Sequence, residues 1–211
     1  MGGLSEVVYC DDALIVVDKP AGLLSVPGRG DDKQDCLAAR VQREFADALV
    51  VHRLDMATSG LFLMARGVKA QRTLSIAFAG REVRKRYVAL VTGSMPASEG
   101  EIDLPLGADW PNRPRQKVDH EIGKPSRTLW HVIAHDDKID TTRVELDPVT
   151  GRSHQLRVHL MAIGHPILGD ALYAPRAVQG LAPRLMLHAT QLELAHPCSG
   201  KTLLFRSEAP F

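Results

Sequence analysis

Apolar runs of strand length dominate the hydrophobic pattern of the chain. Residues 13–17 (ALIVV) form the first run, and a Pro- and Gly-rich loop follows over residues 19–30. Gly, Pro and Asp residues separate the later runs, as is typical of strands joined by turns. The other predicted strand segments are 50–51, 61–65, 83–92, 101–106, 115–122, 127–134, 142–147 and two pieces of 186–206 on either side of a turn at 196–200.

Three segments carry apolar residues at the three- to four-residue spacing of an amphipathic helix. We expect one helix capped by Asp35 and running to about Phe45, one over residues 67–79 ending at Gly80, and one capped by Ser153, running from His154 to Ile163 and closed by Gly164 and Pro166. Strands outnumber helices and follow one another in runs, so we expect an α+β fold with a mostly antiparallel sheet. The chain shows no repeat, low-complexity tract or long linker, and we expect a single domain over residues 1–211.

Composition places the chain among globular proteins of the cytoplasm. Hydrophobic residues make up 45% and charged residues 24% of its 211 residues, which is ordinary for a globular protein. No apolar run approaches the roughly 18 residues that a membrane helix needs, and the first residues do not resemble a signal peptide. The three cysteines, Cys10, Cys36 and Cys198, are far apart and odd in number. They indicate neither a disulfide framework nor a zinc site, and they favour a reducing cytoplasm.

The net charge of +1 does not by itself indicate a nucleic-acid-binding protein. The basic residues, however, are 18 Arg and 8 Lys, and the arginine guanidinium is suited to bidentate contacts with phosphate. Basic residues cluster at 81–86 and 113–117, whereas acidic residues cluster at 136–140. A protein with one basic face can bind RNA while its total charge stays near zero.

Asp55 lies in a polar loop between two apolar segments. A carboxylate in such a loop is expected to be partly buried and to need a partner. An alternative is that Asp55 only stabilises a turn by accepting from the amides of Thr58 or Ser59, with Arg53 in solvent. For an isolated Arg-Leu-Asp sequence this alternative is favoured.

Two further segments carry residues of interest. In TGRSHQLRVHL (150–160), Arg157 lies on the same helix face as apolar residues, and the alternative to a functional role is an arginine whose head reaches solvent from an amphipathic helix. In RKRYVAL, Lys85 and Tyr87 share one strand face, and Arg84 and Arg86 share the other. A tyrosine at that position is by default a residue of the core or its rim.

Taken together, the blocks HRLDMATSGL (52–61), KRYVAL (85–90) and TGRSHQLRVH (150–159) resemble the RluA family of RNA pseudouridine synthases. VDKPAGLLSVPG (17–28) and GHPILGDALY (164–173) are similar to that family as well, so the resemblance covers nearly the whole chain. DWPNRPRQKV (109–118) and GKPSRT (123–128) resemble its dual-specificity members, whose targets include ribosomal and transfer RNA. We expect no N-terminal accessory RNA-binding domain, because the matching blocks begin near Met1.

The resemblance implies a pseudouridine synthase catalytic core, in which helices and loops flank a sheet and a central active-site cleft. It implies that Asp55 is the nucleophile, that Arg157 pairs with the Asp55 carboxylate, and that Tyr87 stacks against the target uracil. Arg53 resembles the residue that enters the RNA helix in place of the extruded nucleotide. The other arginines that we expect to contact RNA are Arg84, Arg86, Arg113 and Arg115.

The implied reaction converts a specific uridine to pseudouridine in a stem-loop of 23S rRNA, in the anticodon stem-loop of tRNA, or in both. It breaks the N1–C1′ bond, turns the uracil and joins C5 to C1′, so it needs no redox change and no phosphate energy. We therefore expect no cofactor and no metal, and a monomer whose partner is RNA. The carboxylate can attack C1′, act in an elimination that gives a glycal, or add to C6 of the base. Extruding the base costs a few kcal/mol, which a side chain filling the gap offsets.

Two other classes of protein are consistent with parts of the sequence. The first is an RNA-binding or ribosome-assembly factor without chemistry, which the presence of both Asp55 and Arg157 disfavours. The second is a metal-dependent hydrolase, suggested by the nine histidines. His154 and His159 are five residues apart, about 140° around a helix, so they cannot grip one ion as a pair four residues apart does. We expect most of the histidines, including His165, His188 and His196, to form ordinary hydrogen bonds.

Overall fold

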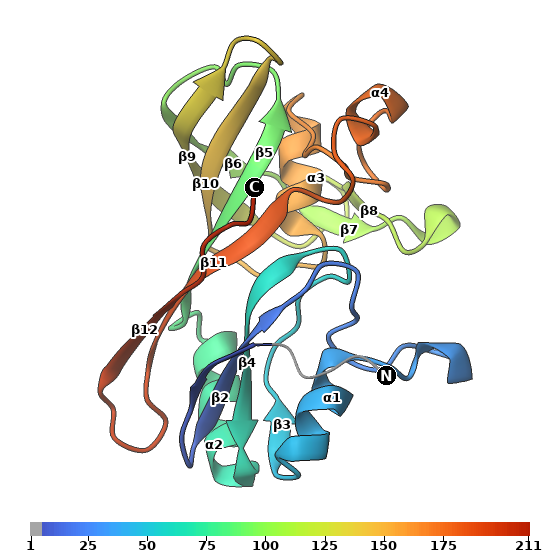
Figure 1. The fold of residues 1–211 in the computed structure, drawn as a ribbon. Coiled ribbons are helices and arrows are strands. Elements are labelled where there is room, and N and C mark those ends of the chain that lie inside the picture. Colours follow the sequence, from blue (N-terminus) through green and yellow to red (C-terminus); the bar gives the residue numbers. More distant parts are fainter. Residues whose placement is uncertain (1–5) are drawn as a thin grey trace. The chain divides into compact units, whose positions relative to one another are not determined.

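The apolar runs of the sequence form strands in the computed structural model, which describes residues 6–211. The described chain divides into two compact units. Unit 1 comprises the residues up to Lys85 together with His188–Pro210, and unit 2 comprises Arg86–Leu187 together with Phe211. Strands β5 (Arg84–Thr92) and β11 (Leu187–Ala195) contribute residues to both units (Figure 1).

The strands of unit 1 follow the order β1-β2-β4-β11, with β3 beside β4 and β12 beside β11. Their bounds are Val7–Cys10 for β1, Leu14–Lys19 for β2, Ala48–Val50 for β3, Ser59–Arg66 for β4 and Thr202–Arg206 for β12. Every pairing is antiparallel except that of β4 with β11, which is parallel. Helix α1 (Leu37–Glu44) packs against β3, and α2 (Gly67–Ala79) packs against β3 and β4.

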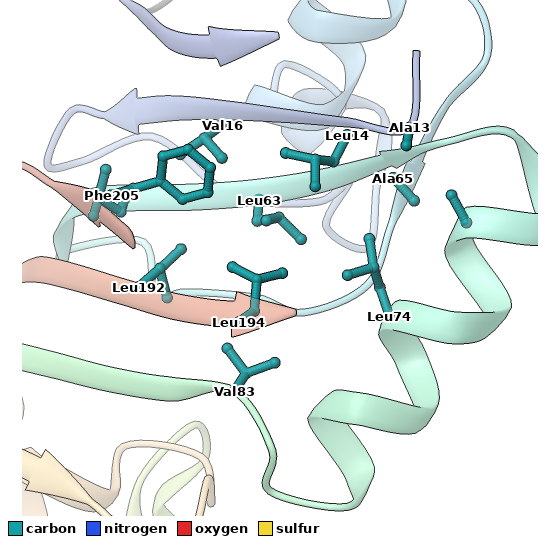
Figure 2. Close-up of a cluster of buried hydrophobic side chains, with 12 residues drawn as sticks. Ala13, Leu14, Val16, Leu63, Ala65, Leu74, Val83, Leu192, Leu194 and Phe205 are labelled. Carbon is teal, nitrogen blue, oxygen red and sulfur yellow. The ribbon is translucent and has the colours of Figure 1, made fainter. Parts of the chain in front are cut away.

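The core of unit 1 is built from alternate residues of its strands. Figure 2 shows Leu14 and Val16 of β2 beside Leu63 of β4, with Leu74 of α2 closing one side. Successive strand residues point to opposite faces, yet Ile15 is also fully buried, as are Phe62 and Met64. Strands covered on both faces read as continuous apolar runs, which explains why 13–17 and 61–65 show no alternation.

Gly60 permits the parallel pairing of β4 with β11. It pairs with Ala189 of β11 and has a φ of 108°, a backbone conformation that residues other than glycine rarely adopt. A Cβ atom at this position would overlap the main-chain oxygen of Ala189. The glycine after Thr58 and Ser59 is therefore required for β4 to lie directly beside β11.

Unit 2 contains an antiparallel sheet in the order β5-β10-β9-β6 and a separate hairpin of β7 and β8. Helix α3 packs against β8 and β10, and it is buried from Gln155 to Leu160. The bounds are Glu99–Asp103 for β6, Leu106–Ala108 for β7, Gln116–Val118 for β8, Arg127–Asp136 for β9, Thr141–Pro148 for β10, Gln155–Ala162 for α3 and Arg176–Gln179 for α4. Single turns of 3-10 helix lie at Asp31–Lys33 and Trp110–Asn112.

The structure confirms the α+β class, the mostly antiparallel pairing and the end of α2 at Gly80. Two predicted helix caps are wrong. Cys36 caps α1, because its Sγ accepts from the amide of Ala39. The Asp35 carboxylate instead accepts from Nη2 and Nε of Arg40 at 2.6 and 2.8 Å. Ser153 does not cap α3.

The turn before α3 is held by a glutamine side chain. The helix begins after His154, whose φ is 55° and whose side chain forms no cap hydrogen bond. The Gln155 Oε1 accepts from the amide of Arg152 at 3.0 Å and from the Thr150 hydroxyl at 2.7 Å. A buried glutamine therefore fixes the turn that precedes α3, and no side chain takes the capping role expected of the serine.

Strand β1 and helix α4 were not predicted, since Val7–Cys10 is short and mostly exposed and α4 has a single turn. No helix within residues 6–211 is long and apolar enough to cross a membrane. The interpretation of the chain start as lacking a signal peptide concerns in part residues 1–5, which lie outside the described residues.

Candidate active site

The main chain around Asp55 is held by the Pro- and Gly-rich loop that follows β2. The Ser25 hydroxyl donates to the Leu54 oxygen at 2.8 Å and accepts from the Leu54 amide at 3.1 Å. On the other side of Asp55, the amide of Gly22 donates to the Met56 oxygen at 2.8 Å. Both neighbours of Asp55 are thus fixed through their backbones, while Asp55 itself is half-buried.

Lys19 connects the same two loops through buried hydrogen bonds. It is fully buried, and its ammonium donates to the main-chain oxygens of Pro20 at 2.9 Å, Leu23 at 2.7 Å and Met56 at 3.0 Å. These bonds use all three N–H groups of the ammonium. Burial lowers the pKa of Lys19 to about 8, and the negative charge of Asp55 opposes that shift. At neutral pH Lys19 therefore supplies a fixed positive charge near Asp55.

The sequence analysis assigned no role to Lys19. A lysine two residues after a fully apolar run and directly before a proline could have indicated a buried charge. Burial of such a charge requires partners, but nothing local shows that one of them is the oxygen of Met56, 37 residues away.

We expect Lys19→Met to reduce turnover at least about tenfold. The substitution removes the cost of burying a charge, about 3 kcal/mol for the pKa shift from 10.5 to about 8. It also leaves three carbonyl groups without their donor, at about 1–3 kcal/mol each. These effects on stability partly offset one another, whereas the position of the Asp55 loop is not restored. Single-turnover rates and urea unfolding measure the two effects.

The matched control for Lys19→Met is Lys69→Met, an exposed position on α2. We expect this control to react and unfold like the wild type. Turnover by Lys19→Met at the wild-type rate would show that the buried lysine does not position the loop.

The amide of Thr58 donates to the main-chain oxygen of Asp55 at 3.1 Å, which closes a turn. A chain of hydrogen bonds then fixes the start of β4. The Ser59 hydroxyl lies 2.8 Å from Nδ1 of His188, Nε2 of His188 lies 2.9 Å from the Ser207 hydroxyl, and Ser207 donates to Asp18. Ser59 is only 4% exposed and His188 only 2%. This serine–histidine pair is therefore closed to a substrate, and its role is structural.

His52, in the same block as Asp55, is a neutral acceptor. Its Nε2 accepts from the amide of Leu63 at 2.9 Å, and its ring contacts Phe62 and Phe78 at centroid distances of 4.9 and 4.6 Å. Burial lowers the pKa of His52 to about 3, and the positive charge of Lys85 acts in the same direction. The imidazole therefore stays uncharged at neutral pH.

The low pKa of His52 predicts a loss of stability in acid. Between pH 6.5, its ordinary pKa, and about 3, the unfolded chain binds a proton that the folded chain excludes. The free energy of unfolding therefore falls as the pH falls through this window. His52→Gln keeps an acceptor for Leu63 but does not titrate. From pH 7.5 to 4.5 we expect the wild type to lose about 3 kcal/mol more than this variant. Equal losses in urea unfolding would contradict the assignment.

Arg157 of α3 forms a buried ion pair that the sequence analysis did not foresee. Its Nε and Nη2 donate to the two carboxylate oxygens of Asp170 at 2.8 and 2.7 Å. Arg157 is 4% exposed and Asp170 is fully buried. Asp170 also accepts from the amides of Leu172 at 2.9 Å and Tyr173 at 3.2 Å. The guanidinium is thus oriented by a carboxylate that is itself fixed by main-chain donors.

Asp170 stands in the GHPILGD block, whose resemblance to the family was noted without a role for the aspartate. The preceding glycine, Gly169, has a φ of 71°, and a Cβ atom there would overlap the oxygen of Arg184. The backbone that turns Asp170 toward Arg157 therefore requires glycine. In the sequence, the Gly-Asp pair after an apolar run could have indicated this turn.

The other predicted site residues have contrasting surroundings. Tyr87 is half-buried on β5, opposite Leu146 of β10. Arg86 forms ion pairs with Glu145 at 3.2 Å and Asp147 at 3.3 Å. Arg84 lies 3.6 Å from Glu193. A phosphate at Arg84 or Arg86 would have to compete with these carboxylates, whereas Arg53, Arg113 and Arg115 are exposed and form no ion pair within the described contacts.

A hollow in the surface of unit 1 lies beside the Asp55 loop. It is lined by residues 20–24, Lys33, Asp35, Arg40 and Met56. Arg40 is paired with Asp35 at 2.6 Å, so Lys33 gives the hollow its surplus positive charge. Because Met56 directly follows Asp55, a ligand in this hollow would lie next to the Asp55 loop.

The histidines named above form ordinary hydrogen bonds, as expected. Their partners are Tyr173 for His154, Thr128 and Leu104 for His159, Thr92 for His165, Ser59 and Ser207 for His188, and Asp11 for His196. Among residues 6–211, no group of three or more His, Cys, Asp or Glu side chains is arranged to hold a metal ion. The three cysteines are free thiols.

Comparison with known proteins identifies the family. The RNA pseudouridylate synthase family matches residues 13–162, a segment that holds Asp55, Tyr87 and Arg157. The chain belongs to this family. The fold agrees, since the structure of human RNA Pseudouridylate Synthase Domain Containing 1 superposes with a TM-score of 0.82 at 30% identity, covering 100% of this chain and 86% of that one.

Within the family, the chain is similar to proteins named dual-specificity RNA pseudouridine synthase RluA. It is 51% identical to the one from Escherichia coli O6:H1 over 205 residues, covering 97% of this chain and 93% of the relative. It is 52% identical to the Yersinia pestis protein, with coverage of 97% of this chain and 99% of the relative. The chain is 48% identical to the Pasteurella multocida protein, with coverage of 98% of this chain and 94% of the relative. These relatives confirm the resemblance to the RluA family.

Proposed function

We propose that this chain isomerises a specific uridine to pseudouridine in a stem-loop of large-subunit ribosomal RNA, in the anticodon stem-loop of tRNA, or in both, with Asp55 as nucleophile. The observation that carries the proposal is the Asp55 loop itself. In a chain of this family, a half-buried aspartate has both neighbouring residues fixed by Ser25, Gly22 and Lys19. The curated relatives supply the substrate class, since they are named dual-specificity RNA enzymes.

The reaction requires one carboxylate and a rotation of the uracil. The N1–C1′ bond of the uridine breaks, the uracil rotates, and C5 bonds to C1′, while C5 loses a proton and N1 gains one. A carboxylate at Asp55 can take part by attack at C1′, by an elimination, or by addition to C6, and every route uses the same side chain. None of these steps transfers electrons to an acceptor, so we propose that the enzyme needs no metal and no cofactor.

The remaining roles follow the family resemblance and the local contacts. Arg157 would act on the Asp55 carboxylate, since a guanidinium carries five donors and its two bonds to Asp170 are compatible with a second carboxylate. Tyr87 would stack on the extruded uracil, and Arg53 would fill the gap it leaves. Arg84, Arg86, Arg113 and Arg115 would contact phosphates, and the hollow beside Met56 would receive part of the RNA loop.

We further propose that the protein acts as a monomer in the cytoplasm. Its free thiols suit a reducing compartment. A catalytic core of near-zero net charge cannot hold a long duplex tightly, and RNA specificity usually comes from loops whose bases can be splayed out. One hairpin should therefore contain all that the enzyme recognises.

Synthetic hairpins of both kinds test the proposal. We expect each hairpin, without ribosomal proteins, to yield pseudouridine at a rate that excess EDTA does not change in monovalent salt. Tritium release from C5-labelled uridine measures the product. Loss of activity in EDTA that zinc restores would point to a metal enzyme. Reaction with ribosomal particles but with neither hairpin would contradict the small recognition site while leaving the enzyme class intact.

A further inference from the structure

The two tryptophans of the chain have opposite surroundings. Trp130 of β9 is 7% exposed and packs over Gly100, whereas Trp110 is 66% exposed in the connection between β7 and β8. The guanidinium of Arg113 lies 3.4 Å from the centre of the Trp110 ring. Because most of Trp110 stays exposed while Arg113 covers one face of the indole, the opposite face is open to solvent.

An exposed aromatic residue is ordinary on a protein surface, so the exposure of Trp110 alone decides nothing. Its loop, however, is closed by its own backbone. The amide of Asp109 donates to the Arg115 oxygen at 3.0 Å, and the amide of Arg115 donates to the Asn112 oxygen at 3.0 Å. The Asn112 side chain also donates to the Asp109 carboxylate at 3.0 Å. In Figure 1 the connection extends beyond the ends of β7 and β8, and Trp110 begins the 3-10 turn within it.

The loop is also tied to the surroundings of Arg157. Directly after it, the amide of Gln116 donates to the Tyr173 hydroxyl at 2.8 Å. That hydroxyl lies 2.6 Å from Nδ1 of His154, and the Tyr173 ring lies 5.0 Å from the Arg157 guanidinium. One tyrosine therefore contacts both the base of the loop and Arg157, the proposed partner of Asp55.

The charge around Trp110 is positive. Arg113 and Arg115 are exposed on the same loop, and Asp109, the one acid of residues 109–115, is engaged by Asn112. An open aromatic face flanked by arginines is the combination that binds unpaired nucleotides, because the base stacks on the ring and the guanidinium groups neutralise the adjoining phosphates. Paired bases cannot stack in this way, since their faces are already covered by their neighbours.

We propose that Trp110 is a stacking platform for an unpaired base of the RNA substrate other than the target uridine, with Arg113 holding the ring from behind and Arg115 on an adjoining phosphate. The proposal rests on the proposed function, which makes RNA the substrate. It adds a binding residue that charge clustering alone did not reveal.

Indole fluorescence tests the stacking directly. In a Trp130→Phe background Trp110 is the only tryptophan, and a hairpin with an unpaired loop should quench its emission at least about twofold as binding saturates. A duplex of the same length without unpaired bases should quench it little. If Trp130→Phe does not fold, the same titration on the wild type and on Trp110→Phe gives the difference signal.

Binding constants supply the second measurement. Trp110→Leu should weaken hairpin binding about tenfold, whereas Trp110→Phe should keep most of the affinity, because a phenyl ring still stacks. Leu181→Ala, at an equally exposed apolar position that is 57% exposed, is the matched control and should bind like the wild type.

Quenching by the hairpin together with weaker binding of Trp110→Leu supports the platform. Wild-type affinity of Trp110→Leu, or weaker binding with no change in indole emission, overturns it. A surface made for a protein partner would respond to neither RNA, which also overturns it. Neither assay measures turnover, so a hairpin that quenches Trp110 but yields no pseudouridine would contradict the proposed function and leave the platform standing.

Discussion

Asp55→Asn should abolish pseudouridine formation while leaving RNA binding nearly unchanged. Asparagine has the size and shape of aspartate but cannot act as an anionic nucleophile. The loop should keep its position, because Ser25, Gly22 and Lys19 hold it through the main chain of Leu54 and Met56. Affinity should persist, because phosphate contacts supply most of it.

The measurement is product formation on a hairpin, paired with the dissociation constant of the same hairpin. Asp12→Asn, at an exposed position in the loop before β2, is the matched control and should react at the wild-type rate. Product from Asp55→Asn at a tenth of the wild-type rate or more would remove Asp55 as the nucleophile.

Arg157→Met should cost both stability and activity. It leaves the fully buried Asp170 charge with only the amides of Leu172 and Tyr173 as partners. Breaking a buried ion pair on one side destabilises a protein by about 3–5 kcal/mol. Arg157→Lys should be impaired as well, because a lysine cannot make the two parallel bonds to one carboxylate.

A double variant separates the two losses. Combining Arg157→Met with Asp170→Asn removes both charges, so urea unfolding should return toward the wild type. Activity should stay absent, because the guanidinium that would act on Asp55 is still missing. Recovery of activity together with stability would show that Arg157 only supports the fold. An Arg157→Met variant as stable as the wild type would show that the pair with Asp170 contributes nothing.

Asp55 shows what sequence blocks can predict and what they leave to be tested. Taken as an isolated tripeptide, Arg-Leu-Asp favoured a turn aspartate, and the amide of Thr58 does close a turn on the Asp55 main chain. Three blocks in one order pointed instead to a family, and the family match over residues 13–162 confirmed that resemblance. The roles of Asp55, Tyr87 and Arg157 stay predictions, for which the variants above are the tests.

Local periodicity alone determined much of the secondary structure. The apolar runs at 13–17 and 61–65 became β2 and β4, and the helical spacing over 67–79 became α2 with its end at Gly80. Such patterns are reliable because backbone geometry relates neighbouring side chains directly, every second residue in a strand and every third or fourth in a helix. The blocks of family residues likewise lie in continuous segments, which a sequence displays without any knowledge of the fold.

Only the tertiary structure decided which distant groups pair. Lys19 shares its ammonium with the oxygen of Met56, and Arg157 is oriented by Asp170. In each case a charge or donor had several candidate partners along the chain. The choice depends on which groups the folded backbone brings within about 3 Å of one another in a low-dielectric interior, where an unpaired charge is costly. No local pattern of hydrophobic and polar residues encodes that distance.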